Sequence, residues 1–443
     1  MVSISDRKSR VPGFWRTARA RVAVGAAASA ALAVGGVLAA TGSSSAATGA
    51  LSHNWYASAP YLFVDGSQPD PTQVMAATGA KAFEIAFILA PNGGGCSPTW
   101  NGTDPIGGDT TVGPVINAIR GAGGDVSVSI GGYGGTKLGQ TCGTAAATAA
   151  AYQQVVTQYG LHAMDFDLEE PEYENSTAIA NELGAAQILQ RDNPGMYISV
   201  TMPGTAAGTG WFGTQLLDEA KSLGFSPDNF SIMPFDGGFS GAASQTGALE
   251  AFHSLLMTHL GWDSATAYAH EGISSMNGRT DAAEFFYQSD FASVLSYATS
   301  HGLGRYTFWD VNRDRQCNPP DNNGTLSGSC SSVPQNAWDF TKYTVQFAGA
   351  TPPSTPPSST AASPSASASA SPSPSKSAGA SPSASPSKSS GGGTCTAPAW
   401  NSTTAYNGGA VVSYSGHTWT AKWWTEADTP GGAAGVWTDD GPC

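Results

Sequence analysis

The sequence predicts an α/β protein whose main part is a (β/α)8 TIM barrel, followed by a small all-β domain at the C-terminus. Three observations lead to this prediction. Short apolar runs alternate with longer Ala-rich stretches between residues 54 and 349, which is the order of a parallel sheet with helical crossovers. Residues 350–394 are almost entirely Ser, Pro, Ala, Thr and Gly, and residues 395–443 begin and end with a cysteine.

Strands and helices alternate regularly within the span 54–349. The eight predicted strands are Ala59–Val64, Ala82–Leu89, Asp125–Ile130, Ala163–Glu169, Tyr197–Met202, Phe230–Met233, Ala267–Ile273 and Tyr306–Trp309. Helices are predicted at Thr144–Tyr159, Ser176–Arg191 and Asp281–His301. Eight strands with intervening helices fit a (β/α)8 barrel, and a doubly wound sheet is the alternative fold.

Residues 1–47 have the layout of a secretory signal peptide. Six basic residues lie between Arg7 and Arg21, an apolar run of small residues covers 22–40, and the small residues 45–47 offer a cleavage site. An N-terminal membrane anchor is the alternative. We expect cleavage, and therefore a secreted, extracellular protein without membrane attachment.

Charge and cysteine content agree with an extracellular chain. The net charge is −14, and removal of the leader leaves 13 Lys and Arg against 32 Asp and Glu. Such a surface repels nucleic-acid phosphates and suits a neutral polymer. An even number of cysteines in an exported chain predicts disulfides. Among fifteen possible connectivities, we expect the pairs that are nearest in the sequence: Cys96–Cys142, Cys317–Cys330 and Cys395–Cys443.

Residues 350–394 should form a disordered linker, because they cannot bury enough apolar surface to offset the entropy of ordering. The linker separates the large domain from residues 395–443, and this arrangement favours a catalytic domain joined to a targeting domain. No cysteine pair has metal-ligand spacing. We therefore expect neither a metal nor a cofactor, and we expect a monomer.

The most informative segment is the predicted strand 163–169. Side chains on a strand alternate between its faces, so Asp165, Asp167 and Glu169 share one face and the apolar residues between them share the other. In a barrel the carboxylates would project inward, with Glu169 nearest the carboxyl ends of the strands, where barrel enzymes keep their active sites. Repulsion and burial would raise at least one pKa, as a general acid requires. A solvated acidic face and a divalent-metal site are the alternatives.

Four motifs in order resemble those of family 18 glycoside hydrolases, the chitinases. Residues 162–169 resemble the D-x-x-D-x-D-x-E signature of that family's fourth strand, and residues 129–132 (SIGG) resemble the S-x-G-G of its third strand. Residues 233–236 (MPFD) resemble the M-x-Y-D of the sixth strand, and Trp309 resembles the tryptophan under the substrate on the eighth. The resemblance covers about 54–349.

Two positions depart from the family pattern. His162 stands where the first Asp of the signature is usual. By strand parity it faces away from the carboxylates, so we expect a structural consequence only. Phe235 replaces a tyrosine whose hydroxyl holds the substrate acetamido group in many relatives, and its ring cannot donate that hydrogen bond. Either another donor substitutes for it or the activity is lowered.

The resemblance implies a retaining, substrate-assisted mechanism with a single general acid/base. Glu169 would protonate the glycosidic oxygen, Asp167 would orient the acetamido group, and Asp165 would share a proton with Asp167. Asp236 and Met233 would contact the sugar before the cleaved bond, and Trp309 would stack under it.

The C-terminal residues 395–443 are rich in aromatic side chains and resemble carbohydrate-binding modules of family 5/12, which carry an A-K-W-W-T-type motif (residues 421–425 here). By that match Tyr406, Trp423 and Trp424 would form a chitin-facing surface. The other aromatic residues are expected in the core or scaffold: Trp400, Tyr414, Trp419 and Trp437.

The predicted function is therefore that of a secreted, endo-acting chitinase whose partners are chitin and N-acetylchitooligosaccharides. An endo-β-N-acetylglucosaminidase acting on N-glycans shares the barrel and the carboxylate motif, but it needs no tether to a solid. A non-catalytic chitin-binding protein is the third hypothesis, which Phe235 favours and the intact carboxylates oppose.

Overall fold

The computed structural model describes residues 50–321 and 324–350. In the C-terminal domain it describes residues 395, 397–402, 404, 406, 410–421, 425, 428–432 and 436–443. The predicted signal peptide and nearly all of the predicted linker lie outside the described residues. The two described parts of the chain are considered separately below.

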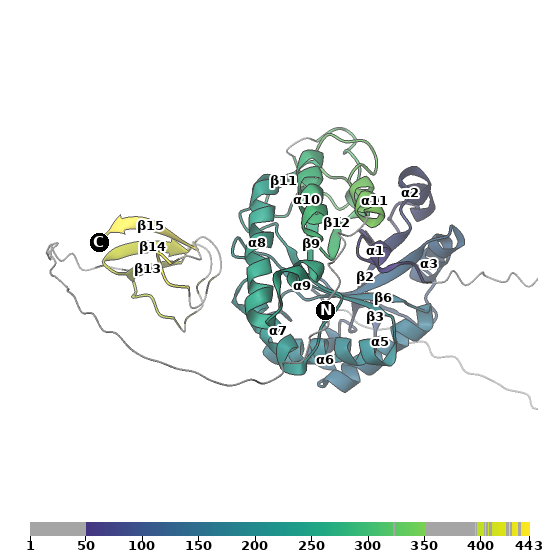
Figure 1. The fold of residues 1–443 in the computed structure, drawn as a ribbon, viewed down its shortest axis with the longest axis horizontal. Coiled ribbons are helices and arrows are strands. Elements are labelled where there is room, and N and C mark those ends of the chain that lie inside the picture. The colour runs from purple at the N-terminus through teal and green to yellow at the C-terminus, as the bar shows by residue number, and fades with distance from the viewer. Residues whose placement is uncertain are drawn as a thin grey trace, which may run out of the picture. The chain divides into compact units, whose positions relative to one another are not determined.

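Eight parallel strands form the first part (Figure 1). They are β1 (Tyr61–Phe63), β2 (Ala82–Leu89), β5 (Asp125–Gly131), β6 (Ala163–Asp167), β7 (Tyr197–Pro203), β8 (Asn229–Met233), β9 (Glu271–Met276) and β12 (Arg305–Trp309). Each pairs with the next in chain order. The Tyr306 N–H donates to the Ala57 carbonyl at 3.0 Å, which brings β12 back to the chain before β1. The predicted (β/α)8 barrel is confirmed, and the doubly wound sheet is wrong.

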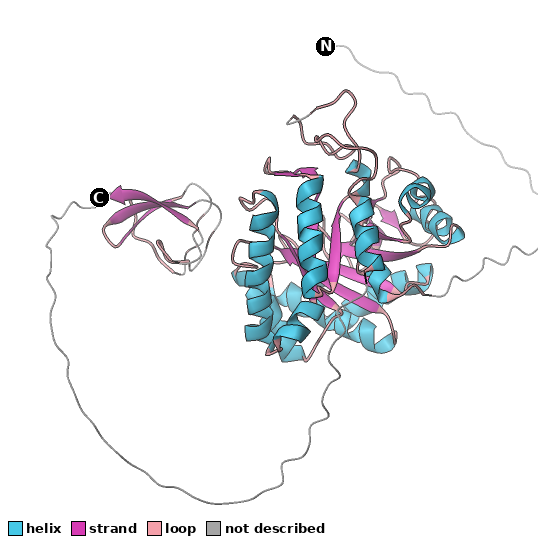
Figure 2. Cartoon of the chain, turned by 45° about the horizontal axis from the view of Figure 1, so that its top comes forward, coloured by secondary structure: helices cyan, strands magenta, loops and turns pink. Residues whose placement is uncertain are grey.

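The helices surround the strands on the outside, as Figure 2 shows in cyan around magenta. They are α1 (His53–Tyr56), α2 (Pro71–Thr78), α3 (Val112–Gly121), α4 (Leu138–Thr141), α5 (Ala145–Tyr159), α6 (Ser176–Asp192), α7 (Trp211–Leu223), α8 (Gly241–Leu260), α9 (Ser264–Ala269), α10 (Gln288–His301), α11 (Thr341–Gly349) and the 3-10 helix η1 (Val311–Arg313). Among the described residues, no helix combines the length and apolar character that a membrane span requires.

Two predicted boundaries were wrong for local reasons. The seventh strand begins at Glu271 rather than Ala267, because Asp263 caps the short helix α9 by accepting a hydrogen bond from the Thr266 N–H at 2.8 Å. The last long helix begins at Gln288 rather than Asp281, because residues 278–286 form a hairpin of β10 (Gly278–Arg279) and β11 (Phe285–Phe286). A further antiparallel pair, β3 (Thr99–Trp100) and β4 (Asp104–Pro105), extends the sheet beside β2.

The outward face of β6 packs under the helices as predicted. Met164, Phe166 and Leu168 are completely buried, and the Phe166 ring meets the Tyr152 ring of α5 edge to face at 5.6 Å. The alternation of apolar and acidic residues thus divides the strand between an apolar layer outside the barrel and a polar interior.

The C-terminal domain contains a three-stranded antiparallel sheet of β13 (Val411–Tyr414), β14 (His417–Ala421) and β15 (Trp437–Pro442). A disulfide joins Cys395 to Cys443, and this staple suits a domain that has few residues for a core. In the barrel, disulfides join Cys96 to Cys142 and Cys317 to Cys330. All three predicted disulfides are confirmed.

Substitution of Phe166 by alanine should lower the free energy of unfolding by about 3–5 kcal/mol, because it leaves a cavity between β6 and α5. Urea denaturation of the two proteins measures this difference. The control is Tyr133→Ala, since Tyr133 is 83% exposed and should change stability by less than about 0.5 kcal/mol. Equal effects of the two substitutions would contradict the described packing.

Candidate active site

The three predicted carboxylates lie in order from the barrel interior to its mouth. Asp165 and Asp167 are buried at 0% and 3% exposure on β6. Glu169 follows two residues after the strand and is partly exposed. Because Glu169 follows the carboxyl end of a barrel strand, it lies at the end of the barrel where barrel enzymes bind substrates.

Asp165 is surrounded by hydrogen-bond donors. The side chains that donate to its two oxygens are Tyr61 (2.9 Å), Ser129 (3.0 Å), Ser199 (2.6 Å) and Thr201 (2.9 Å). The Arg305 guanidinium lies 3.3 Å away. A carboxyl group that receives this many donors acts as an acceptor with both oxygens, which is the pattern of an ionised carboxylate.

Arg305 is completely buried in the centre of the barrel and pairs with a second carboxylate. Its Nη2 lies 2.7 Å from Glu84 Oε1, and burial raises the pKa of Glu84 to about 8, against the opposing effect of Arg305. Gly272 leaves room for this side chain, since a Cβ there would lie 2.7 Å from the Arg305 Cβ. Sequence reasoning missed Arg305 and Glu84, although both lie on correctly predicted strands or next to them.

Asp167 differs in its environment from Asp165. Burial raises its pKa well above the ordinary value, and the negative charges of Glu169 and Asp165 raise it further. Its Oδ2 lies 3.4 Å from the Tyr61 hydroxyl, whereas its Oδ1 makes no hydrogen bond within the described structure. Asp167 is thus a carboxyl group that favours its neutral form and keeps one oxygen available.

Glu169 has the raised pKa that a general acid needs. Burial raises the pKa of Glu169 to about 7, the positive charge of Lys137 opposes this shift, and Glu170 and Asp236 add to it. Lys137 is itself buried and donates from Nζ to the Gly132 carbonyl. Sequence reasoning also missed Lys137, because it lies in a loop five residues beyond the third-strand motif.

The glycines of the third-strand motif allow two close approaches. A Cβ on Gly131 would lie 2.1 Å from the Asp167 carbonyl oxygen, and one on Gly132 would lie 2.7 Å from the Phe87 ring. Both glycines have positive φ, 92° and 75°. They therefore let the end of β5 approach the backbone of β6 at Gly131 and the Phe87 ring at Gly132.

Trp309 ends β12 and is partly exposed. Its ring stacks on Phe87 with 5.5 Å between centroids and 12° between planes, and Tyr61 lies 5.7 Å away. Aromatic packing on these sides fixes the indole plane. The exposed part of a fixed indole can stack against the apolar face of a pyranose ring.

The sixth-strand motif lies on β8 and the loop that follows it. Met233 is buried at 8% exposure, Phe235 is partly buried against the core, and Asp236 is exposed with φ at 57°. His162 lies at the opposite end of β6, with its Nδ1 3.0 Å from Asp125 Oδ2. The prediction that His162 faces away from the carboxylates is confirmed.

The aromatic residues of the C-terminal domain divide as follows. Trp437 is buried, and Trp400 and Trp419 pack against the same small core. Tyr406 is half-buried, and its ring meets the Trp437 ring edge to face at 5.3 Å. Trp423 and Trp424 lie outside the described residues, so their predicted role stays a prediction.

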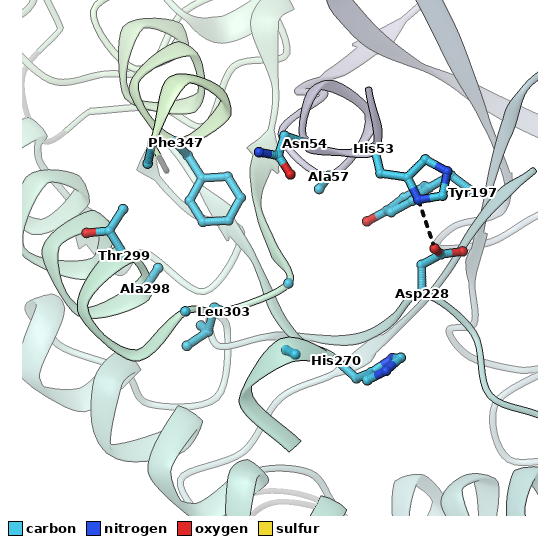
Figure 3. Close-up of a pocket in the computed structure, with 14 residues that line it drawn as sticks. His53, Asn54, Ala57, Tyr197, Asp228, His270, Ala298, Thr299, Leu303 and Phe347 are labelled. Atoms are coloured by element: carbon cyan, nitrogen blue, oxygen red, sulfur yellow. Dashed lines mark ion pairs between the residues drawn. The ribbon is translucent and has the colours of Figure 1, made fainter. Parts of the chain in front are cut away.

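A hollow of about 340 Å³ lies at the amino ends of the strands (Figure 3). Tyr197 and Gly304 line it, and His53 and Asp228 form an ion pair of 3.2 Å at its wall. It is at the other end of the barrel from Glu169. In the described part of the chain, no group of three or more His, Cys, Asp or Glu side chains is arranged to hold a metal ion.

Two curated relatives match the barrel. The chain is 28% identical over 275 residues to the probable bifunctional chitinase/lysozyme of Escherichia coli (strain K12), covering 58% of this chain and 30% of that protein. It is 26% identical over 275 residues to endochitinase 11 of Metarhizium anisopliae, covering 58% of this chain and 52% of that protein. The aligned region thus spans about a third to a half of these relatives.

The fold is also that of a solved chitinase domain. The catalytic domain of a hyperthermophilic chitinase from Pyrococcus furiosus superposes with a TM-score of 0.58 at 24% identity, covering 66% of this chain and 94% of that one. Residues 399–438 match the model of carbohydrate-binding module family 5/12. The barrel therefore has the fold of a chitinase catalytic domain and a sequence similar to those of the two relatives. More particularly, the predicted resemblance is confirmed: the barrel is chitinase-like, and it is followed by a segment of the 5/12 type.

The Glu169 carboxyl should titrate near pH 7, which 13C NMR of labelled glutamate side chains measures directly. Asp236→Asn should lower this pKa, because a negative charge that disfavours ionisation is removed. Lys137→Met should raise it, because a favourable positive charge is lost. A midpoint near the ordinary glutamate value of about 4.3 in the wild-type protein, or shifts of the opposite sign, would contradict the described environment.

Proposed function

We propose that this protein is a secreted chitinase that hydrolyses β-1,4-N-acetylglucosamine linkages with retention of configuration. The observation that carries the proposal is the contrast between Asp167, the last residue of β6, and Glu169, two residues further on. A partly exposed acid with a pKa of about 7 follows a buried carboxyl that favours its neutral form. One acid beside a neutral carboxyl suits substrate assistance better than the usual pair of acid and carboxylate nucleophile.

In the first step Glu169 donates its proton to the glycosidic oxygen as the bond from that oxygen to C1 breaks. The carbonyl oxygen of the substrate's own acetamido group forms a new bond to C1, which gives a positively charged oxazolinium ring. In the second step the Glu169 carboxylate takes a proton from water, and this water attacks C1. The ring opens, the acetamido group is restored, and the product keeps the β configuration.

The buried carboxylates act on the acetamido group rather than on C1. Asp167 has an oxygen without a hydrogen bond in the described structure, and this oxygen can orient the acetamido group. As positive charge develops on the oxazolinium ring, ionisation of Asp167 becomes favourable, and Asp165 can hold the proton that Asp167 gives up. Tyr61 contacts both carboxyl groups and can carry their shared hydrogen bond.

Substrate binding rests on Trp309, Asp236 and the C-terminal module. The indole of Trp309 offers a fixed plane for the sugar before the cleaved bond, and Asp236 offers a carboxylate to its hydroxyl groups. The family 5/12 match at 399–438 supports attachment to a solid polymer. That attachment favours chitin over the N-glycan substrates of an endo-β-N-acetylglucosaminidase, which are soluble.

Secretion, a monomeric state and endo action belong to the same proposal. The three disulfides support an oxidising compartment, which agrees with the signal-peptide layout. Cleavage at residue 47 would leave the barrel and the module on one extracellular chain.

The direct test compares the wild-type protein with Glu169→Gln on colloidal chitin and on N-acetylchitohexaose. The wild type should release N-acetylchitooligosaccharides whose first-formed anomer is β, and the variant should lose at least about 100-fold in rate because its amide cannot donate the proton. The matched control is Glu170→Gln, which removes the neighbouring carboxylate and should lower the rate by less than about tenfold.

Initial α-anomers would contradict retention, and equal losses in the two variants would contradict the role of Glu169. A wild-type protein that binds chitin without cleaving it would favour the third hypothesis, in which the barrel has lost its activity.

A further inference from the structure

The loop that follows β8 carries Asp236 in a backbone conformation that needs support. Asp236 has φ at 57°, and a residue other than glycine in this region is held there by its surroundings at a cost of about 1 kcal/mol or more. The loop is also exposed at Asp236 and Gly238. Packing around those two residues therefore cannot supply the support.

Glu284 supplies it from a different part of the chain. Its carboxylate accepts three backbone hydrogen bonds from this loop: from Asp236 N at 2.7 Å, Gly238 N at 2.6 Å and Phe239 N at 2.7 Å. Successive backbone N–H groups that converge on one anion form a nest. Here the anion is a side chain of the protein itself.

The contact is reciprocal. The Ala282 N–H donates to Asp236 Oδ1 at 2.6 Å, so the side chain of Asp236 is held by the same hairpin whose Glu284 holds its backbone. Within the described structure, Asp236 Oδ2 makes no hydrogen bond. The carboxylate is thus fixed through one oxygen and leaves the other available.

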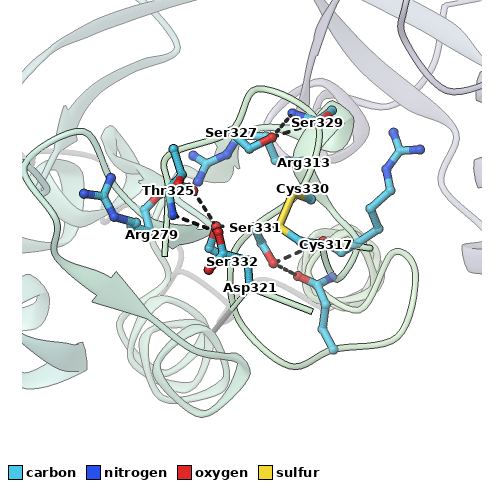
Figure 4. Close-up of a disulfide and its surroundings, with 12 residues drawn as sticks. Arg279, Arg313, Cys317, Asp321, Thr325, Ser327, Ser329, Cys330, Ser331 and Ser332 are labelled. Atoms are coloured by element: carbon cyan, nitrogen blue, oxygen red, sulfur yellow. Dashed lines mark hydrogen bonds between the residues drawn. A yellow bond between two sulfur atoms is a disulfide. The ribbon is translucent and has the colours of Figure 1, made fainter. Parts of the chain in front are cut away.

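The hairpin itself is fixed at its base. The Thr280 N–H donates to the Glu284 carbonyl at 2.9 Å, and the Arg279 N–H donates to the Ser331 carbonyl at 2.8 Å. Ser331 directly follows Cys330, whose disulfide to Cys317 closes the adjoining loop (Figure 4). A stapled loop thus supports the hairpin that carries Glu284.

Charge links this arrangement to the acid. Asp236 is among the groups that raise the pKa of Glu169, after burial and Glu170. Burial raises the pKa of Asp281, the negative charge of Asp236 raises it further, and Arg313 and Arg279 lower it. The position of the Asp236 carboxylate therefore affects both sugar binding and the proton affinity of Glu169.

We propose that Glu284 is a positioning residue for the sugar-binding loop: through its three backbone hydrogen bonds it fixes Asp236 so that Oδ2 meets the sugar before the cleaved bond. The proposal rests on the proposed function, because it assigns Asp236 a contact with that sugar. It adds a residue that none of the four motifs contains and that lies 48 positions from Asp236 in the sequence.

The test uses the full chain and N-acetylchitohexaose, with four proteins: Glu284→Gln, Asp236→Asn, the double variant and Asp290→Asn. In Glu284→Gln the new amide would direct its N–H group at a backbone N–H, so the nest loses an acceptor. Asp290 is the matched control, since its carboxylate also accepts backbone N–H groups, from Ala242 at 3.1 Å and Tyr287 at 2.8 Å, but none from the loop of Asp236.

Glu284→Gln should lower kcat/KM by about 10- to 100-fold, the loss expected when a substrate-positioning group is displaced. It should also move the basic limb of the kcat/KM profile to lower pH, as Asp236→Asn does, because the charge that raises the pKa of Glu169 is no longer held in place. The double variant should match Asp236→Asn alone, since Glu284 acts through Asp236. Asp290→Asn should keep the wild-type profile.

Additive losses in the double variant, or a Glu284→Gln profile with an unmoved basic limb, would overturn the proposal. If Glu284→Gln does not fold, Ala282→Pro tests whether the same hairpin positions Asp236, because it removes the N–H that donates to Asp236 Oδ1, and the same two readouts apply. A wild-type protein that does not cleave the hexamer would instead overturn the proposed function, so the two failures are distinguishable.

Discussion

The buried guanidinium of Arg305 is the group around which the polar interior of the barrel is arranged. A charge without water must be paired, and it must have its hydrogen bonds satisfied. Arg305 is paired with Glu84 at 2.7 Å and Asp165 at 3.3 Å, and its Nη1 donates to the Ser199 hydroxyl, whereas its Nε has no hydrogen-bond partner within the described structure. Burial raises the pKa of Glu84 and the charge of Arg305 opposes that rise, so the guanidinium and the two acidic side chains depend on one another.

The same constraint sets the chemistry further along β6. Asp165 is the acceptor of four hydroxyl groups and the counter-ion of Arg305. Burial raises the pKa of Asp167 well above the ordinary value, and the negative charges of Glu169 and Asp165 raise it further. Glu169, nearer the solvent and opposed by Lys137, has a pKa of about 7. Asp167 and Glu169 thus owe their raised pKa values to burial and to the charges beside them.

Much of this could be predicted from the sequence, because strand parity decides which side chains point inward. The alternation along β6 gave the order Asp165, Asp167, Glu169, and the Ser-Gly-Gly and Trp309 motifs placed their elements at the barrel mouth. Strand parity could also have placed Arg305 and Glu84 in the barrel interior. Each is a single charged residue in or beside an apolar strand, however, so no repeated pattern marked it as part of the site. The structure shows that a glycine, Gly272, makes room for Arg305, a relationship between two strands that no local pattern records.

Glu284 and Lys137 could not be predicted, for a different reason. Both lie in loops. Glu284 acts on the loop after β8 through backbone N–H groups, and Lys137 acts on Glu169 through its positive charge. A carboxylate that accepts N–H groups 45 to 48 positions away depends on how two loops meet. Residues 281–287 were wrongly predicted as the start of a helix, because their composition suits one. In the structure, the contacts of Glu284 and the backbone hydrogen bond from Thr280 to Glu284 favour a hairpin instead.

The central claim is that the donors around Asp165 hold it as a carboxylate, whereas Asp167 and Glu169 keep their protons below pH 7. Neutron diffraction of deuterium-exchanged crystals at pH 6 tests it most directly, because it locates the deuterons themselves. The account predicts a deuteron on Glu169 and on Asp167, none on Asp165, and a fully deuterated Arg305 guanidinium beside it. A deuteron on Asp165, or a bare Glu169 at that pH, would contradict the account.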